Sequence, residues 1–376
     1  MFKEWLENRF ILYGCGLEAE KFVCRNKVGM ISNIEICIDG FRTGKFHGIE
    51  IKKIEQVENL ASKKIIVATL PETYEKIKNI LDLSGLIEFK HYVHISYIEK
   101  KVLVVNANCH GLGLKKYLCM SKEFRKKYVI YHMPEIQDNK DKEISRFLLD
   151  KIDVLITQDI RLQNKFSDKL SLDYLKSAVN ESCSIIVIPN LVGMGKWLYP
   201  QHGDNDKIVN LANGNWPLIH EDTILEKAIL NGCQNLSDYI EFINDYECDK
   251  DIIKESYDKF IKKIEARELK WDIKIKDYII NHMNAMEIFC DRDHPSVEIM
   301  KYIGREVLKK LNCSVINDSE YDFILGLPMP LLTCIRKYYN ISCIEADCLD
   351  YYKCNQEELL ETYIRNYLFI AHEIII

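Results

Sequence analysis

Residues 101–111 read KVLVVNANCHG, and they predict a turn between a strand and a helix. Residues 102–105 are apolar and mostly β-branched, which is typical of a buried strand. Polar residues end this run, Gly111 and Gly113 follow, and the apolar spacing of a helix begins at Leu114. In an open α/β sheet such a turn lies at the carboxyl ends of the strands, where ligands bind.

Cys109 lies in this turn, beside the predicted start of the helix. The amides of a helix N-terminus favour a thiolate, so Cys109 is a candidate nucleophile with Asn108 and His110 as its neighbours. The alternative is that Cys109 is one of 14 cysteines, most of which are buried and inert. Other polar residues at strand ends favour the functional interpretation.

Two later strands are also predicted to end in amide side chains. The strand at 152–159 contains Gln158 near its end, and the strand at 183–188 is followed by Asn190. Because parallel strands bring their carboxyl ends to one edge, these amides are candidate donors to an oxyanion. Each amide taken alone is more simply a loop cap, and their shared position favours a common site.

His294 lies in the segment FCDRDHPS at 289–296, just before a predicted helix at 297–311. Ser296 is a candidate N-cap, and a histidine on such a loop is a candidate general base. The alternative is a histidine that only hydrogen-bonds its own loop. Asp291 precedes His294 at the Asp-x-x-His spacing of SGNH-type esterases, and an early nucleophile with a late histidine follows their order; this comparison is an analogy.

Residues 1–98 predict a small unit of alternating strands and helices. A strand at 10–13 leads into GCGLEA, a G-x-G-x-x-A turn beginning with Gly14 and Gly16. Asp39 ends the second strand about 20–25 residues later, where an acid contacts a ribose hydroxyl in dinucleotide-binding folds. The unit resembles the Rossmann-like modules beside sugar-modifying enzymes of surface-polysaccharide pathways. A nucleotide or nucleotide-sugar site and a purely structural turn are both open, and the unit is too short for a complete dehydrogenase domain.

Length, composition and the alternation of strands and helices together predict a two-domain α/β protein of the cytoplasm. We expect a Rossmann-like domain at 1–98 and a larger, helix-rich α/β domain with a mainly parallel sheet at 99–376. The net charge of −6 argues against nucleic-acid binding, and no apolar stretch approaches the roughly 20 residues of a membrane span. Scattered cysteines without C-x-x-C pairs indicate a reducing compartment and no metal site rather than a disulfide scaffold.

Residues 101–376 resemble the WcbI family of polysaccharide biosynthesis proteins. The family's opening motif, (G/A)NCQ, is matched by ANCH, with His110 where glutamine is usual. The later family motifs occur in the same order at DVLITQ (153–158), PN (189–190), RE (267–268) and DHPS (293–296).

The resemblance implies coenzyme A or acetyl-coenzyme A as cofactor and transfer of an acyl group, taken as acetyl, to a sugar or glycan hydroxyl of a capsular or other surface polysaccharide. In one route His294 deprotonates the hydroxyl, which attacks the thioester directly. In the other, Cys109 attacks first and forms an acyl-enzyme. His110 would act as a donor or a second base. Candidate partners for the coenzyme's phosphates are Lys115, Lys196 and Arg267.

Two other classes of protein are open at this point. An SGNH-like carbohydrate esterase would turn over acyl esters without coenzyme A. A non-catalytic protein that binds a nucleotide sugar would keep its function when Cys109 or His294 is replaced. The sequence leaves the acceptor sugar, the acyl group and the oligomeric state open.

Overall fold

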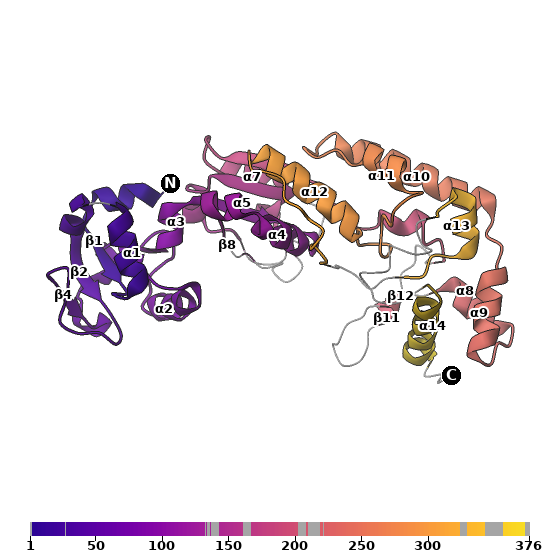
Figure 1. The fold of residues 1–376 in the computed structure, drawn as a ribbon, viewed down its shortest axis with the longest axis horizontal. Coiled ribbons are helices and arrows are strands. Elements are labelled where there is room, and N and C mark those ends of the chain that lie inside the picture. Colours follow the sequence, from indigo (N-terminus) through magenta and orange to yellow (C-terminus); the bar gives the residue numbers. More distant parts are fainter. Residues whose placement is uncertain are drawn as a thin grey trace. The chain divides into compact units, whose positions relative to one another are not determined.

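The computed structural model describes residues 2–26, 28–131, 133, 136, 143–160, 167–201, 208–209, 219–220, 222–323, 329–342 and 356–372. By its packing the chain divides into two compact units, coloured along the sequence in Figure 1. The first unit is formed by residues 1–106 and 122–186, and the second by residues 107–121 and 187–376.

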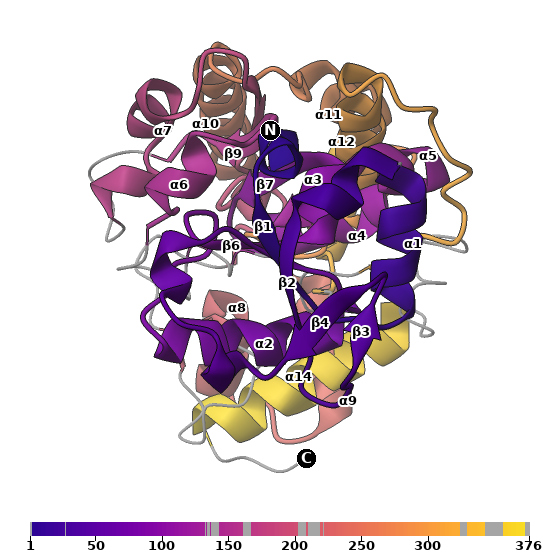
Figure 2. The same cartoon turned by 90° about the vertical axis from the view of Figure 1, so that its left-hand side faces the viewer.

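The first unit contains a six-stranded, mainly parallel sheet in the order β3-β4-β2-β1-β5-β6. Its strands are β1 (Phe10–Tyr13), β2 (Ile34–Ile38), β3 (Lys45–Phe46), β4 (Ile49–Lys52), β5 (Ile65–Val67) and β6 (Tyr92–His94). Figure 2 shows β2 between β1 and β4, with the short β3 at the edge. Its helices are α1 (Leu17–Asn26), α2 (Pro71–Leu83) and α3 (Ile95–Glu99). This arrangement confirms the Rossmann-like prediction.

A second sheet has the order β10-β9-β7-β8. Its strands are β7 (Lys101–Asn106), β8 (Tyr128–Tyr131), β9 (Val154–Gln158) and β10 (Ser184–Ile188), and β7 pairs in parallel with β8 and β9. The carboxyl ends of β7 and β9 are neighbours, because Asn106 donates from Nδ2 to Thr157 Oγ1 at 3.0 Å. The prediction of a mainly parallel sheet is therefore confirmed. The adjoining helices are α5 (Lys122–Lys127), α6 (Arg146–Leu149) and α7 (Leu172–Ala178).

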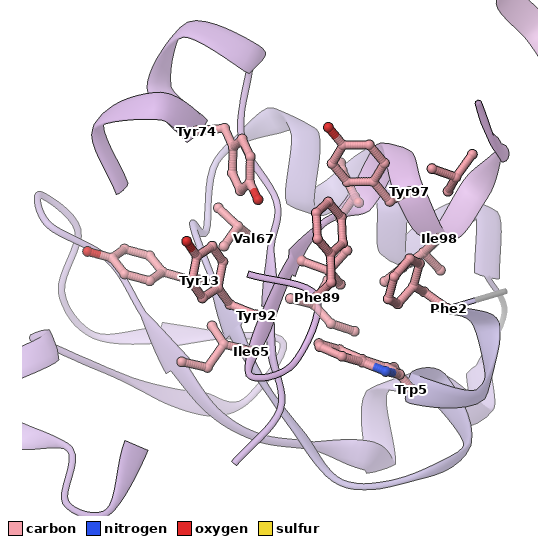
Figure 3. Close-up of a cluster of buried hydrophobic side chains, with 14 of the residues drawn as sticks. Phe2, Trp5, Tyr13, Ile65, Val67, Tyr74, Phe89, Tyr92, Tyr97 and Ile98 are labelled. Atoms are coloured by element: carbon pink, nitrogen blue, oxygen red, sulfur yellow. The ribbon is translucent and has the colours of Figure 1, made fainter. Parts of the chain in front are cut away.

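One buried apolar cluster, part of which is drawn in Figure 3, packs against both sheets of the first unit. Phe89 lies at its centre, with ring centroids 5.6 Å from Phe2 and 5.3 Å from Tyr97. The cluster also includes Ile98 and Val102, which flank the expected boundary between residues 98 and 99. That boundary falls between the two sheets, and the division into domains at this point stays a prediction.

The second unit is rich in helices. They are α4 (His110–Met120), α8 (Thr223–Leu230), α9 (Leu236–Asp245), α10 (Lys250–Glu268), α11 (Lys276–His282), α12 (Val297–Lys310), α13 (Thr333–Tyr339) and α14 (Gln356–His372), with short strands β11 (Ile208–Val209) and β12 (Ile219–His220). Figure 1 shows α4 beside α12, and Gly304 of α12 lies so close to the Tyr117 ring that any side chain there would overlap it. This contact fixes the helix that begins next to Cys109.

The chain also forms short 3₁₀ helices. They are η1 (Phe2–Glu7), η2 (Val28–Asn33), η3 (Ile54–Gln56), η4 (Leu60–Ser62), η6 (Asp168–Leu170) and η7 (Gly195–Trp197).

Several elements differ from the sequence-based predictions. The pattern of residues 272–283 predicts a helix, but α11 begins only at Lys276, because Asp272 exchanges hydrogen bonds of 2.7 and 2.8 Å with the backbone of Val187. Residues 143–149 also predict a helix, and the structure forms only α6 within that range. The apolar run at 127–132 predicts a strand that ends at His132, which lies outside the described residues.

A disulfide joins Cys248 to Cys334, whose Cα atoms are 5.8 Å apart. The scattered cysteines had not indicated this bridge, since a separation of 86 residues says nothing about proximity in the fold. Within the described ranges no His, Cys, Asp and Glu side chains gather as a metal-binding group. None of the helices described has both the length and the apolar character that crossing a bilayer requires.

Candidate active site

The turn that follows β7 places Cys109 as the N-cap of α4. Asn108 fixes this turn, because its Oδ1 accepts the backbone N–H of His110 at 3.0 Å and its carbonyl accepts that of Gly111 at 2.8 Å. Cys109 is half-buried, whereas Asn108 and His110 are buried. The turn therefore holds a thiol beside the amides that begin a helix, where a negative charge is favoured.

Asp291 orients the imidazole of His294. Oδ1 of Asp291 accepts the backbone N–H groups of Asp293 and His294, each at 2.7 Å, and Oδ2 lies 2.8 Å from Nδ1 of His294. Because Nδ1 faces this carboxylate, Nε2 is the nitrogen left for the Cys109 side chain, with which His294 is hydrogen-bonded. The three residues form a thiol–imidazole–carboxylate array, the arrangement that activates a nucleophile.

His294 has an unusual protonation state in this array. Burial acts to lower the pKa of His294, but the hydrogen bonds and charges of Asp291 and Cys109 outweigh it and raise that pKa to about 10. The imidazole is therefore protonated at neutral pH.

His110 is a second histidine with the opposite behaviour. Burial and the nearby charge of His294 lower the pKa of His110 to about 3, so this ring is neutral at physiological pH. Its centroid lies 6.1 Å from that of His294, and its Nε2 lies 3.4 Å from the carbonyl oxygen of Asp293. A neutral ring of this kind exchanges hydrogen bonds but does not accept a proton near pH 7.

Asn190 lies beside the cysteine turn, because its Oδ1 is 3.4 Å from Nδ2 of Asn108. The loop that carries it is held by α10: Arg267 donates to the carbonyl of Asn190 at 3.0 Å, and Lys263 donates to that of Gly193 at 3.2 Å. Gly193 has a φ of +66°, which favours glycine. The loop is thus fixed between α10 and the cysteine turn.

Several cations gather next to this loop. Burial and the like charges of Arg267 and Lys196 lower the pKa of Lys263 to about 8, and Arg292 adds to this effect. Asp293 supplies a negative charge, with its Oδ2 3.1 Å from Nε of Arg292. Positive charge therefore accumulates between α10, η7 and the segment that carries His294.

The second unit thus brings together most of the predicted residues of the larger domain. Gln158 is buried at the end of β9 in the first unit, and its part in the site stays a prediction. Lys115 lies further along α4 than His110, and its part in binding a coenzyme also stays a prediction.

The glycine turn of the first unit is held by its own acid. Asp39 accepts the backbone N–H groups of Cys15, Phe41 and Arg42 at 2.8–2.9 Å, and these bonds, acting against burial, lower its pKa. Gly14 has a φ of +95°, while Gly16 has open space beside its Cα. This geometry gives Asp39 a structural role in the turn, and its contact with a ribose stays a prediction.

Three residues near Cys109 or near the loop that carries Asn190 were not predicted from the sequence as site residues. Asp291 was visible in the Asp-x-x-His spacing but was not chosen as a site residue. Lys263 could have been found from the repeat of Lys259, Lys263 and Arg267 at intervals of four along one helix. Arg292 gave no signal besides its place next to Asp293.

Residues 102–315 match the sequence profile of a family described as polysaccharide biosynthesis enzyme WcbI. No curated protein has a sequence that matches this chain. The fold is similar to a solved structure of WcbI, described as a novel polysaccharide biosynthesis enzyme in a native form without a disulfide bond between coenzyme A and a cysteine. The two sequences are 15% identical, the TM-score is 0.49, and the match covers 73% of this chain and 99% of that one.

Proposed function

Because this chain belongs to the WcbI family of polysaccharide biosynthesis enzymes, we propose that it acylates a sugar hydroxyl, with an acyl-coenzyme A as donor and Cys109 as nucleophile. The observation that carries this proposal is the array of Cys109, His294 and Asp291. We take the acyl group to be acetyl and the acceptor to be a precursor of a capsular or other surface polysaccharide, modified in the cytoplasm.

The charge on His294 favours the route through an acyl-enzyme. In direct transfer His294 must take a proton from the sugar, but with a pKa of about 10 it already holds one at neutral pH. In the covalent route that same proton is an advantage, because the imidazolium stabilises the thiolate of Cys109 and can later protonate the leaving group.

The covalent route proceeds in two steps. The Cys109 thiolate attacks the thioester carbonyl, the bond from that carbonyl to the coenzyme's sulfur breaks, and the departing thiolate takes the proton of His294. The sugar hydroxyl then attacks the acyl group on Cys109 and gives its proton to His294. The bond to Cys109 breaks, and the thiolate and imidazolium are restored with no net change in protons.

Amide groups around Cys109 are suited to hold the oxyanion of each step. We assign the oxyanion to the side-chain amides of Asn108 and Asn190, which lie beside the cysteine turn, because the backbone N–H groups of His110 and Gly111 already bond to Asn108. We assign the phosphates of the coenzyme to the neighbouring cations, including Lys196 and Arg267. His110 supplies a neutral hydrogen-bonding group rather than a second base.

The proposal is tested by trapping the acyl-enzyme. The protein is mixed with acetyl-coenzyme A without a sugar, and its intact mass is measured. We expect one acetyl adduct on the wild type, none on Cys109→Ala, and slower formation on His294→Gln. Cys119→Ala is the matched control, because Cys119 is an exposed cysteine on the same helix, and it should keep the adduct.

Two results would contradict the proposal. One is an equal adduct on Cys109→Ala, which would move the chemistry to another residue. The other is the absence of any adduct together with no thermal shift from coenzyme A, since a ligand at about 100 times its dissociation constant stabilises a protein by roughly 2.7 kcal/mol. Hydrolysis of acyl esters without coenzyme A would then support an esterase instead.

A further inference from the structure

A pocket of about 360 Å³ lies between η7 and residues 252–263 of α10, within the second unit. We call it the lysine pocket, because Lys196, Lys259 and Lys263 line it. Its apolar wall includes Trp197 and Phe260, whose stacked rings have centroids 5.2 Å apart. The pocket is therefore a cavity with one rigid aromatic wall and several ammonium groups.

The lysine pocket carries more positive than negative charge. Lys259 and Lys263 are one helical turn apart on α10, so they share a face, and Lys196 faces them from η7. The acid among the lining residues is Glu255, which pairs with Lys259 at 2.9 Å where both side chains are about two-thirds exposed. Water screens this exposed pair, and the half-buried Lys196 and the exposed Lys263 bring two further ammonium groups to the lining.

Among the residues that the structure describes, more positive than negative charges act on Lys263. Arg267, Lys196 and Arg292 act to lower its pKa, and Asp293 acts to raise it. Together with burial, these like charges lower the pKa of Lys263 to about 8. An anion bound beside Lys263 would offset both the desolvation and the repulsion, so the site is electrostatically complementary to a ligand with more than one negative charge.

Gly193 is a glycine in the lining of the lysine pocket. Gly193 forms its rim, and a Cβ atom there would lie 3.5 Å from Nζ of Lys263 and 3.9 Å from Cε of Lys196. Its φ of +66° strains any other residue. A Cβ at position 193 would therefore be in van der Waals contact with the ends of both lysine side chains and with Oδ1 of Asp293, at 3.8 Å.

We propose that the lysine pocket is a phosphate subsite, in which Lys263 and Lys196 bind a phosphate group of a nucleotide-containing ligand. Lysine binds phosphate as a point charge and needs no planar geometry, unlike the paired contacts of arginine with a carboxylate. The source of the phosphate rests on the proposed function: it belongs either to the acyl-coenzyme A or to a nucleotide-linked sugar acceptor.

The first experiment uses inorganic pyrophosphate, because it contains the phosphate groups that acyl-coenzyme A and a nucleotide-linked sugar have in common and nothing else. Calorimetry on the wild type should give binding that weakens by about 10-fold or more in Lys263→Met and in Lys196→Met, as expected for loss of a hydrogen bond from a charged group. Lys254→Met is the matched control, because Lys254 is exposed on α10 and does not line the pocket, and its affinity should be unchanged.

Lys263 also holds the carbonyl of Gly193, so its replacement can disturb the loop. Lys263→Arg keeps a cationic donor and should restore most of the pyrophosphate affinity, and Lys196→Met tests the pocket without removing that bond. No binding of pyrophosphate to the wild type, or equal binding to the wild type, Lys263→Met and Lys196→Met, would overturn the proposal.

A second set of measurements identifies the source of the phosphate. Loss of affinity in Lys263→Met for coenzyme A but not for dephospho-coenzyme A would assign the phosphomonoester of the coenzyme. Equal loss for both would assign its diphosphate. Loss only for a nucleoside diphosphate sugar would assign the acceptor, and each of these results supports the subsite.

The two proposals can fail separately. If only the proposed function is wrong, no acetyl adduct forms at Cys109, but pyrophosphate still binds to the lysine pocket.

Discussion

At the scale of single residues, Asp291 is the group that sets the charge on His294. Asp291→Asn keeps the size of the side chain but removes its charge, so we expect the pKa of His294 to fall from about 10 toward its ordinary value near 6.5. Acyl-enzyme formation should slow by about 10²–10⁴-fold, the usual range for loss of acid–base catalysis. NMR titration of the imidazole checks the pKa, and rapid-quench mass spectrometry checks the rate.

The same substitution has a pH-dependent effect on stability. Because the folded-state pKa of His294 is raised, its contact with Asp291 stabilises the fold fully below about pH 6.5, and this contribution is lost as the pH rises through 10. The free energy of unfolding should therefore differ most between wild type and Asp291→Asn near pH 6, and least near pH 10. A His294 that still titrates near 10 in the variant would refute the role given to Asp291.

His110 offers the contrasting case of a histidine that should not act as a base. With a pKa of about 3, the His110 ring is neutral at physiological pH. Glutamine is also a neutral hydrogen-bonding group. His110→Gln should therefore change the acylation rate by less than about tenfold, well below the effect of losing a general base. The measurement is the rate between pH 5 and 9. Loss of the pH dependence in the variant would assign His110 a proton-transfer role.

The sequence could predict those site residues whose neighbours along the chain form a recognisable pattern. Cys109 stands in a strand–turn–helix segment, and His294 stands before a capped helix, so both were visible without a structure. The protonation states of His294 and His110 were not visible, because they depend on burial and on partners from distant segments. The contact of Arg267 with the carbonyl of Asn190 was equally hidden, since a backbone acceptor has no signature in the sequence.

At the scale of elements, the packing of α4 on α12 should depend on Gly304. An added methyl group would overlap the ring of Tyr117, so Gly304→Ala should destabilise the protein by about 1–3 kcal/mol. Helix propensity alone predicts the opposite sign, a gain of up to about 1 kcal/mol, which makes the sign informative. Urea unfolding measures the change. Gly40→Ala is the control, because it has open space beside it, and a stabilised Gly304→Ala would show that α4 and α12 are less closely packed.

The neighbouring sequence predicted where strands form better than it predicted where a helix begins. The apolar runs correctly predicted β1, β2, β7, β9 and β10, because the buried residues of these strands leave a nearly continuous apolar signal. The start of α11 was wrong because Asp272 bonds to Val187, a partner 85 residues away. The acid after β2 was also found, but the structure uses Asp39 to hold three amides of its own turn and of the glycine turn.

At the scale of the whole molecule, average properties conceal the features that matter most for binding. The net charge of −6 correctly describes an acidic protein, yet Lys196, Lys263, Arg267 and Arg292 gather in one region of the second unit. The α/β class was predictable from the alternation of strands and helices. The division into units was not, because residues 107–121 pack with the second unit although residues of the first unit precede and follow them.

The bridge between Cys248 and Cys334 should stabilise the second unit selectively. It joins the loop before α10 to the first turn of α13 and closes a loop of 86 residues, for which chain entropy gives at most about 4–5 kcal/mol. Cys334→Ser should therefore raise amide hydrogen exchange in α13 and in the first turns of α10 while leaving β1 and β5 of the first unit protected.

Reduction of the wild type with a small thiol serves as the matched treatment, because it opens the bridge without changing the sequence. It should reproduce the exchange pattern of Cys334→Ser. Equal loss of protection in β1 would show that the two units unfold as one cooperative block. An unchanged pattern in α13 would show that packing of the buried Ile335, rather than the bridge, holds this helix in place.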